Sequence, residues 1–492
     1  MSINFIPNDP LAGSTAPAMG QKAPSATRPA NRSGFVYSNT ATQGVAAPGT
    51  AQFLFWQARE AAILAVRAFE ACVGAHKLWQ GGRNKLPLLQ DAGVDLNAFY
   101  DRASFSFFHE TIGTQTFFSG ASTDVVSHEV GHGLLDSLRP DFFSVNFLEV
   151  GAVHEAFGDC MAILTALNDL PTRVALLAVA PDLRKRNFVE GTAEELSKAI
   201  GLFKPGHNAS VPRHAFNTFK YQIPSTLPSN GGPGALINEV HSFGMVFSGC
   251  FWDLIANIFN AGAQKDAAAL ANAAHLAGRI LIAGARQVVV TPRFMQSMGR
   301  AMTLADQTLN AGANRNHIRD AFVRHDILLG SNAMLAPAAV LDGATPSGGA
   351  LSAASRKDLA RRLGSPRGTR FAVQMMGDMG ADTVSAVQTR GVALGSLNVK
   401  LKGVMAMAHE TVMVGNSGGR AAVMGALPNA ANTDSEVLAF VESLLVHKRL
   451  QLPGSKGGEY PKHTTHAVKS VAGKKVLTRV RFACACHGLR LA

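Results

Sequence analysis

The chain has 492 residues, of which 47% are hydrophobic and 16% are charged. These values allow two or three domains with a sizeable core, and they exclude a wholly disordered chain or a coiled coil. No apolar run approaches the ~18 uncharged residues of a membrane span. The sequence starts without a secretory signal and has five scattered cysteines, so we expect a cytoplasmic protein, with non-classical export left open.

The net charge of +12 lies entirely in the C-terminal part of the chain. Residues 1–350 carry 26 Lys and Arg against 26 Asp and Glu, whereas residues 351–492 carry 20 against 8. The C-terminal part could therefore bind an anionic polymer or surface. Its cations are dispersed and have few aromatic neighbours, which favours an ordinary solvated surface instead.

Four segments follow one another along the chain. Residues 1–50 are rich in Ala, Pro, Gly, Ser and Thr, which predicts a disordered or extended arm. Residues 51–330 hold the strongest helical pattern and are expected to form the main domain, and residues 331–355 resemble a linker. Residues 356–492 are expected to form a basic α/β or β-rich domain. The expected helices are 52–79, 122–138, 150–168, 192–202, 239–261, 265–285, 292–309, 314–328 and 434–448, and the expected strands are 86–90, 103–109, 369–376, 384–391, 397–405 and 476–484.

One His-Glu pair stands out from the four in the chain. Only in His128-Glu129-Val-Gly-His132 does a second histidine follow four residues after the first. On a helix these two imidazoles share one face and can reach the same ion. Glu129 lies beside that face, where it can accept a proton from a water activated by the metal. The alternative is a solvated polar face, but Gly131 and Gly133 are costly inside a helix and indicate a close approach.

A third ligand is available on the next expected helix. Glu155 and Asp159 are one helical turn apart, so one carboxylate can bind the metal while the other accepts an imidazole N–H from behind. Catalytic zinc sites use three protein ligands and one open position. Two acids one turn apart are commonly a solvated face, but their place after the two histidines favours a metal site.

These motifs resemble those of the thermolysin-like zinc metallopeptidases. The resemblance covers about 52–329 and rests chiefly on Asp124-Val-Val-Ser-His128-Glu129-Val-Gly-His132 and Gly151-Ala-Val-His-Glu155-Ala-Phe-Gly-Asp159. Weaker matches are Asn97-Ala98-Phe-Tyr, Val240-His241-Ser-Phe-Gly, and the segment from Thr291 to Phe322. The resemblance implies an α+β fold with a small β-containing N-lobe and a helical C-lobe, to which the β-rich C-terminal domain is added.

The resemblance also implies a role for each matching residue. His128, His132 and Glu155 would bind one catalytic Zn²⁺, Glu129 would be the general base, and Asp159 would orient a ligand histidine. The remaining roles concern the substrate: His241 would hydrogen-bond the oxyanion, Asn97 and Ala98 would bind the substrate backbone, and Arg213 would bind a substrate carbonyl. Phe117, Phe118 and Val125 would line a pocket that favours a bulky hydrophobic residue after the cut.

The chain departs from the family pattern at several positions. The stretch between His132 and Glu155 contains Phe142, Phe143 and Phe147 but not the family's tyrosine, a second oxyanion donor. Leu236 replaces an aspartate, although Asn238 or Glu239 could substitute for it, and His154 replaces an asparagine. Asp124 matches a calcium ligand whose expected acidic partner is Ala166 here, which makes calcium binding doubtful.

The sequence therefore predicts a zinc-dependent endopeptidase that acts on peptides or proteins. The alternative is a weakly active or inactive zinc-binding scaffold of the same fold, as the missing tyrosine and aspartate would allow. Cys484-Ala-Cys486-His487 has atypical spacing and no second cysteine pair, so we interpret it as a strand end with ordinary thiols and not as a metal motif. The oligomeric state is not predicted.

Overall fold

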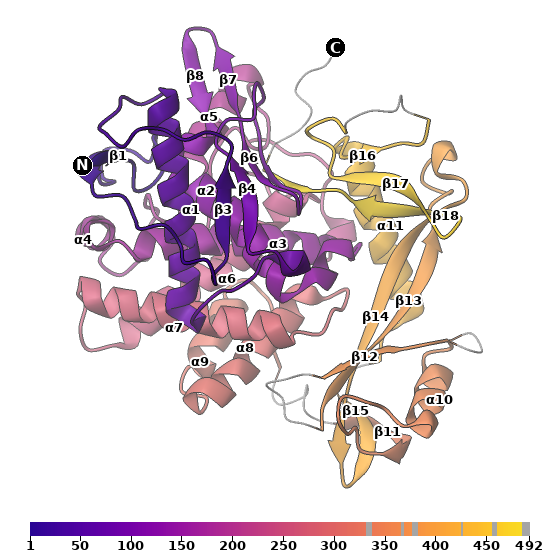
Figure 1. The fold of residues 1–492 in the computed structure, drawn as a ribbon. Coiled ribbons are helices and arrows are strands. Elements are labelled where there is room, and N and C mark those ends of the chain that lie inside the picture. Colours follow the sequence, from indigo (N-terminus) through magenta and orange to yellow (C-terminus); the bar gives the residue numbers. More distant parts are fainter. Residues whose placement is uncertain (331–336, 366–368, 376–381, 425–426, 455–459, 485–492) are drawn as a thin grey trace.

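The computed structural model describes residues 1–330, 337–365, 369–375, 382–424, 427–454 and 460–484. Cys486 and His487 lie outside this part of the chain. Helices form the centre of the molecule, and sheets lie on two sides of them (Figure 1). The expectation of an α+β fold is confirmed.

The first 50 residues follow an extended path along the main domain. They contain the short strands β1 (Ile3–Phe5), β2 (Gly20–Lys22) and β3 (Gly34–Tyr37). Ile3 and Phe5 are buried, and Gln57 donates from Nε2 to the carbonyl oxygen of Ile6 at 3.0 Å. Packing therefore holds this arm in place despite its composition.

A five-stranded sheet lies next to the arm. Its order is β19-β5-β6-β4-β3, and it combines neighbouring strands with one from the far end of the chain. These strands are β4 (Lys85–Leu89), β5 (Ala98–Tyr100), β6 (Phe105–Phe107) and β19 (Phe482–Ala483). The hairpin of β7 (His109–Ile112) and β8 (Gln115–Phe118) follows β6. The expected strands at 86–90 and 103–109 correspond to β4 and to β6 with the start of β7.

Helix α1 (Ala51–Val73) is shorter than expected. Thr50 caps its first turn, and Gly74 ends it with a φ of 79°, which only glycine adopts without strain. The remaining helices of the main domain match the expected positions closely, apart from the unexpected α4. They are α2 (Thr123–Leu138), α3 (Leu148–Leu167), α4 (Leu170–Val179), α5 (Glu194–Phe203), α6 (Val240–Ala261), α7 (Ala267–Gln287), α8 (Phe294–Asn310) and α9 (Arg315–Val323).

Two glycines of α2 let neighbouring groups approach the helix closely. A Cβ atom at Gly131 would lie 3.0 Å from the Cα atom of Gly158 in α3. A Cβ atom at Gly133 would lie 2.6 Å from the ring of Phe105. The sequence analysis inferred such a close approach, and the partners are helix α3 and an aromatic ring. Helices α2 and α3 can therefore bring their polar side chains together.

The C-terminal part forms an eight-stranded sheet with two helices. The segment expected to be a linker, 331–355, contains all of β11 (Pro337–Ala344) and the start of α10 (Ala353–Arg362). Strand β14 begins at Val404, where the expected strand 397–405 ends, and α11 begins after the cap residue Asn429. The other elements are β12 (Ala372–Met375), β13 (Val384–Ala393), β14 (Val404–Ser417), β15 (Arg420–Met424), α11 (Ala430–Val446), β16 (Leu450–Gln451), β17 (His466–Val471) and β18 (Lys474–Arg479).

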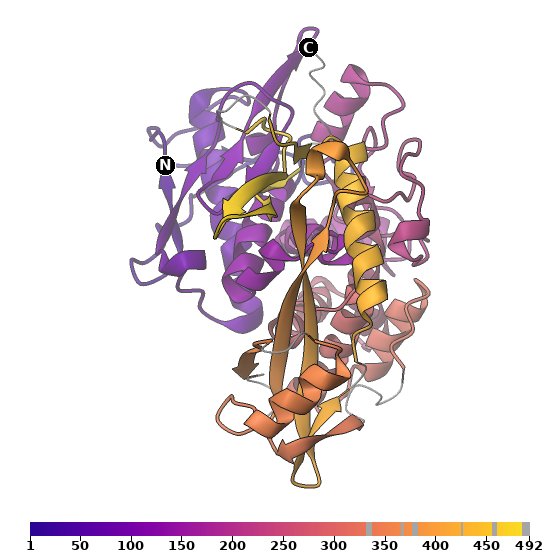
Figure 2. The same cartoon turned by 90° about the vertical axis from the view of Figure 1, so that its right-hand side faces the viewer.

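This C-terminal part packs against the helical domain (Figure 2). Glu436 of α11 lies 3.0 Å from Arg293, and Ser443 donates to the carbonyl oxygen of Asn238 at 2.6 Å. Asn146 donates from its side chain to the carbonyl oxygen of Met407 at 3.0 Å. Strands β13 and β14 extend away as a long ribbon, whereas α11 and β16–β18 lie close to the main domain.

Three helices, α3, α6 and α7, are long and apolar enough to cross a membrane. Their most apolar windows are 100%, 89% and 56% buried inside the structure, respectively. Polar residues interrupt each of these apolar runs, so none stood out in the sequence as a membrane span. Helices α3 and α6 are thus part of the core of this domain, and α7 buries about half of its most apolar window.

Candidate active site

The two histidines of the motif lie on the buried face of α2. The Ser122 side chain caps this helix by accepting from the backbone N–H of Val125 at 3.3 Å. His128 and His132 are both fully buried, and their rings lie 4.7 Å apart. The spacing of one helical turn therefore places both imidazoles together in the interior.

Glu155 of α3 meets both imidazoles. Its Oε2 atom lies 3.2 Å from Nε2 of His128 and 3.4 Å from Nε2 of His132. Nε2 of His132 makes no well-formed hydrogen bond with a described residue. Two imidazoles and one carboxylate are the donor set of a catalytic zinc site, so these residues fit the metal. The structure brings together the three ligands that the sequence analysis named.

Glu129 is buried beside this group. Neither of its carboxylate oxygens makes a well-formed hydrogen bond with a described residue, and one oxygen lies within 4.8 Å of ligand atoms of His128 and His132. Burial raises the pKa of Glu129 well above its ordinary value, and the nearby Cys484 raises it further. A carboxylate with a raised pKa is suited to take and return a proton near neutral pH.

Each of these two histidines contacts another buried side chain through its Nδ1 atom. Nδ1 of His128 lies 2.9 Å from Oδ1 of Asp159, so its N–H donates to this carboxylate and Nε2 is left for the metal. Nδ1 of His132 lies 2.8 Å from Nδ1 of His154. His154 thus occupies the position of the family's asparagine and contacts a ligand histidine.

Arg213 lies on the outer side of Asp159. It belongs to β10 (Arg213–His214), which pairs with β9 (Gly191–Thr192). Its Nη2 atom donates to Oδ1 of Asp159 at 2.7 Å and lies 3.5 Å from Nδ1 of His128. Burial opposes the ionisation of Asp159, but Arg213 and His128 hold its pKa below the ordinary value. Asp159 is therefore a carboxylate at neutral pH.

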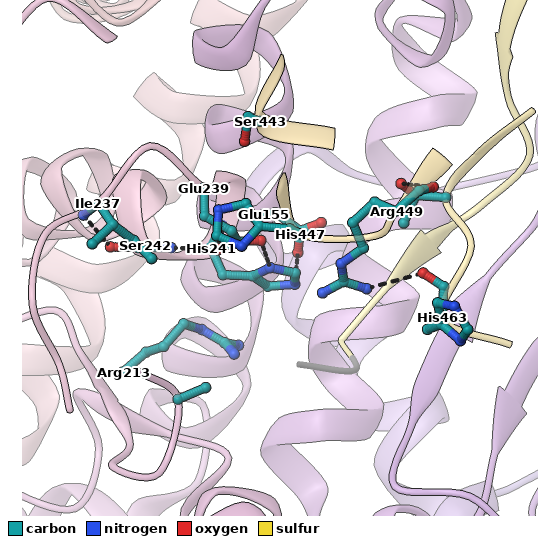
Figure 3. Close-up of polar contacts among 12 residues, drawn as sticks. Glu155, Arg213, Ile237, Glu239, His241, Ser242, Ser443, His447, Arg449 and His463 are labelled. Atoms are coloured by element: carbon teal, nitrogen blue, oxygen red, sulfur yellow. Dashed lines mark hydrogen bonds and ion pairs between the residues drawn. The ribbon is translucent and has the colours of Figure 1, made fainter. Parts of the chain in front are cut away.

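His241 approaches Glu155 from the start of α6 (Figure 3). Its Nε2 atom lies 3.1 Å from Oε2 of Glu155. Glu239 holds the imidazole from the other side, since its Oε1 atom lies 2.8 Å from Nδ1 of His241. The other oxygen of Glu239 caps α6 by accepting from the backbone N–H groups of His241 and Ser242. Of the two substitutes considered for the missing aspartate, Glu239 is the one that contacts His241.

The two residues expected to bind a substrate backbone lie at the start of β5. Asn97 precedes β5, and Ala98 is its first residue. Both already have partners within the chain: Asn97 donates from Nδ2 to the carbonyl oxygen of Lys462 at 3.1 Å, and the carbonyl oxygen of Ala98 accepts from the N–H of Cys484 at 2.8 Å. The C-terminal part therefore covers this side of β5.

Cys484 lies at a strand end, as expected, but the interpretation of its side chain as an ordinary thiol is wrong. Cys484 does follow a short strand, β19, but its side chain lies in the site. The thiol hydrogen-bonds with His128 and His241 and lies against Glu129. Local spacing could not reveal this, because the contact joins the end of the chain to the start of the main domain.

A second group of acids lies near the site. Carboxylate oxygens of Asp9, Asp124 and Glu194 lie within 4.8 Å of one another. Asp9 and Asp124 are buried, and Asp124 accepts from the backbone N–H of Ala193 at 2.8 Å. Asp124 thus lies beside an acid from the arm and one from α5. The family resemblance instead places the acidic partner of this residue at position 166, which is an alanine here. Burial raises the pKa values of all three side chains.

The neighbouring Glu195 allows a test of stability against pH. Burial and the charge of Asp124 raise its pKa from 4.5 to about 8. The folded protein thus keeps a proton that the unfolded chain releases, so stability is lost as pH rises from about 4.5 to 8. We expect Glu195→Gln to reduce the loss between pH 5 and 8 by about 1–3 kcal/mol in urea unfolding. Glu442→Gln, an exposed site on α11, is the control, and equal pH profiles for both variants would contradict the expectation.

Most of the main domain matches the model of a known protein family. Residues 102–333 match the model of the family described as fungalysin metallopeptidase (M36). This segment, just under half of the chain, is similar to that family. It contains α2, α3 and α6 and therefore every residue in the proposed metal site. No curated protein matches the chain.

The match to the fungalysin family model confirms the predicted enzyme class and cofactor. The fungalysin family consists of zinc metalloendopeptidases, which hydrolyse peptide bonds. The resemblance to thermolysin-like zinc metallopeptidases and the choice of zinc are thereby confirmed. The fungalysin match begins after β5 and ends before β11, so β5 and the C-terminal part lie outside it.

Proposed function

We propose that His128, His132 and Glu155 bind the catalytic zinc ion and that the chain cleaves proteins internally. The observation that carries this proposal is the convergence of Nε2 of both histidines on Oε2 of Glu155, at 3.2 and 3.4 Å. The ion would polarise the carbonyl group of the scissile bond and lower the pKa of the attacking water. Asp159 and His154 keep the two imidazoles in position.

The side chains around the metal site transfer the proton, stabilise the oxyanion and bind the substrate. Glu129 takes a proton from the attacking water and passes it to the leaving amine. His241, held by Glu239, donates a hydrogen bond to the oxyanion. Arg213 binds a substrate carbonyl, while its ion pair with Asp159 fixes its position. Asn97 and Ala98 bind the substrate backbone.

A bulky hydrophobic residue is proposed to follow the cut bond. Phe117, Phe118 and Val125 surround one small cavity, whose lining also includes Asn97. Phe117 and Val125 are almost fully buried. An apolar cavity next to the backbone-binding residue supports this preference. The β-containing layer around β4–β6 and the helical layer around α6–α9 would form the two lobes of a thermolysin-like domain.

An inactive zinc-binding scaffold remains the second candidate, on one specific observation. Phe142, Phe143 and Phe147 are all buried and carry no hydroxyl group, so none of them can replace the family's tyrosine as a second oxyanion donor. Removing one such donor costs on the order of 10²–10³ in rate. The buried Glu129 argues for activity, because it makes no ion pair with a described cation and its carboxylate contacts the Cys484 thiol beside the metal site.

The test combines metal analysis with cleavage of an unstructured protein such as casein. We expect about one zinc per chain and internal cleavage that stops on chelation and returns when zinc is restored. Cleavage that continues after all zinc has been removed would contradict the proposed site. Bound zinc without cleavage by any form of the chain, including the variants described below, would favour the scaffold.

A further inference from the structure

The C-terminal part of the chain occupies the place beside β5 where a substrate backbone is expected. Strand β19 pairs antiparallel with β5, with Phe482 opposite Tyr100 and Ala483 opposite Phe99. The N–H of Cys484 then donates to the carbonyl oxygen of Ala98 at 2.8 Å. Without β19, β5 would be the edge strand of this sheet. An added strand is a common mode of peptide recognition, and here the chain itself supplies it.

Phe482 fixes this strand against the metal site. Its ring stacks on His154 at 3.7 Å and on His132 at 4.7 Å between ring centroids. Arg479 lies over the same ring at 4.1 Å and donates to the carbonyl oxygen of Phe143 at 3.2 Å. All of these side chains are buried, so the segment is an integral part of the interior and not a loosely attached tail.

Cys484 reaches the remaining side of the metal site. It is fully buried, and its thiol hydrogen-bonds with His128 and His241 and lies against Glu129. A zinc ion held by three protein ligands keeps a fourth position, and cysteine sulfur is among its preferred ligands. The cavity between Cys484, His241 and Arg213 has about 30 Å³, which is space for water but not for a peptide.

Elements of the C-terminal part hold the segment from outside. The N–H of Val480 donates to the carbonyl oxygen of Thr465 at 2.8 Å, and β18 continues directly into the segment. On the other side of the site, Ser443 and His447 of the α11 region contact the carbonyl oxygen of Asn238, next to Glu239. These attachments present Cys484 to the site at a high effective concentration.

We propose that residues 479–484 are a built-in inhibitor: they take the substrate's place beside β5, and Cys484 supplies the fourth ligand to the zinc ion. The proposal rests on the zinc site proposed above. In this form the position for the attacking water is filled by sulfur, and the backbone groups of β5 are paired. Activity then requires that the segment leave the site.

The proposal is tested by X-ray absorption at the zinc edge of the full chain. We expect one sulfur neighbour at about 2.3 Å, in addition to nitrogen and oxygen ligands, in the wild type. Cys484→Ala and Cys484→Ser should lose this sulfur signal and keep about one zinc per chain. Cys72→Ala, which changes a buried thiol on α1, should keep the signal.

Casein cleavage by the same four proteins provides the second measurement. We expect both Cys484 variants to cleave about tenfold faster or more than the wild type and Cys72→Ala, because an intramolecular ligand has been removed. A wild-type site with only nitrogen and oxygen neighbours, and with equal cleavage by all four proteins, would overturn the inhibitor while leaving the zinc peptidase intact. Absence of zinc from all four would overturn both proposals.

Discussion

Glu129→Gln is expected to lower the rate of casein cleavage by about 10²–10⁴ while the zinc content stays at about one per chain. The amide cannot accept the proton that the carboxylate removes from water. Glutamine has almost the same shape as glutamate, and Glu129 is outside the proposed ligand set, so the metal site should persist. Because the wild type is proposed to be inhibited, the change is best measured in both the wild-type and the Cys484→Ala chains.

The matched control is Glu110→Gln in strand β7. Glu110 also follows a histidine, His109, but this pair lies on the β7–β8 hairpin outside the proposed site. We expect its cleavage rate and zinc content to match those of the parent chain. Loss of zinc from Glu129→Gln would show that Glu129 acts as a ligand, and an unchanged cleavage rate would show that another group is the base.

Asp159→Asn is expected to weaken zinc binding by about 10–100-fold. Asp159 accepts from His128 at 2.9 Å and pairs with Arg213 at 2.7 Å. An asparagine can preserve the hydrogen bond, but it lacks the negative charge that makes the imidazole a better ligand. Competition with a chromophoric chelator measures the affinity directly. The low pKa of Asp159 keeps it ionised above pH 5, so the loss of affinity caused by the substitution should be the same at pH 6 and pH 8.

Asp182→Asn, at an exposed position after α4, is the control for this substitution. It should bind zinc as the parent chain does. Equal zinc affinities of Asp159→Asn and Asp182→Asn would refute the orienting role of Asp159. A loss of affinity that grew with pH between 6 and 8 would show that Asp159 is still partly protonated at pH 6.

The centre of the site was predictable because its geometry is local. A spacing of four residues places His128 and His132 on one face of any helix, and the same spacing relates Glu155 to Asp159. The meeting of the two helices came from the family resemblance, and the structure adds its physical basis. Gly131 and Gly158 lie at the point of contact and leave room for the helices to approach.

The cover of the site was not predictable, because it depends on contacts between distant parts of the chain. A two-residue strand such as β19 carries almost no periodic signal of its own. Cys484 looked unremarkable next to Cys486 and His487, and only its pairing with Ala98 shows where it lies. For the arm, composition left disordered and extended both open, because it does not reveal the partners Gln57 and Thr123 that hold Ile6.

Strand β19 also sets an order of events during synthesis. The ribosome completes the peptidase segment, ending at residue 333, about 150 residues before it reaches Phe482 and Cys484. At about 5–20 residues per second this interval lasts roughly 8–30 s. A nascent chain that folded its metal site at once would spend this time with β5 uncovered. The speed of translation through residues 334–484 would then set how long the active site of each new molecule stays uncovered and able to cleave other proteins.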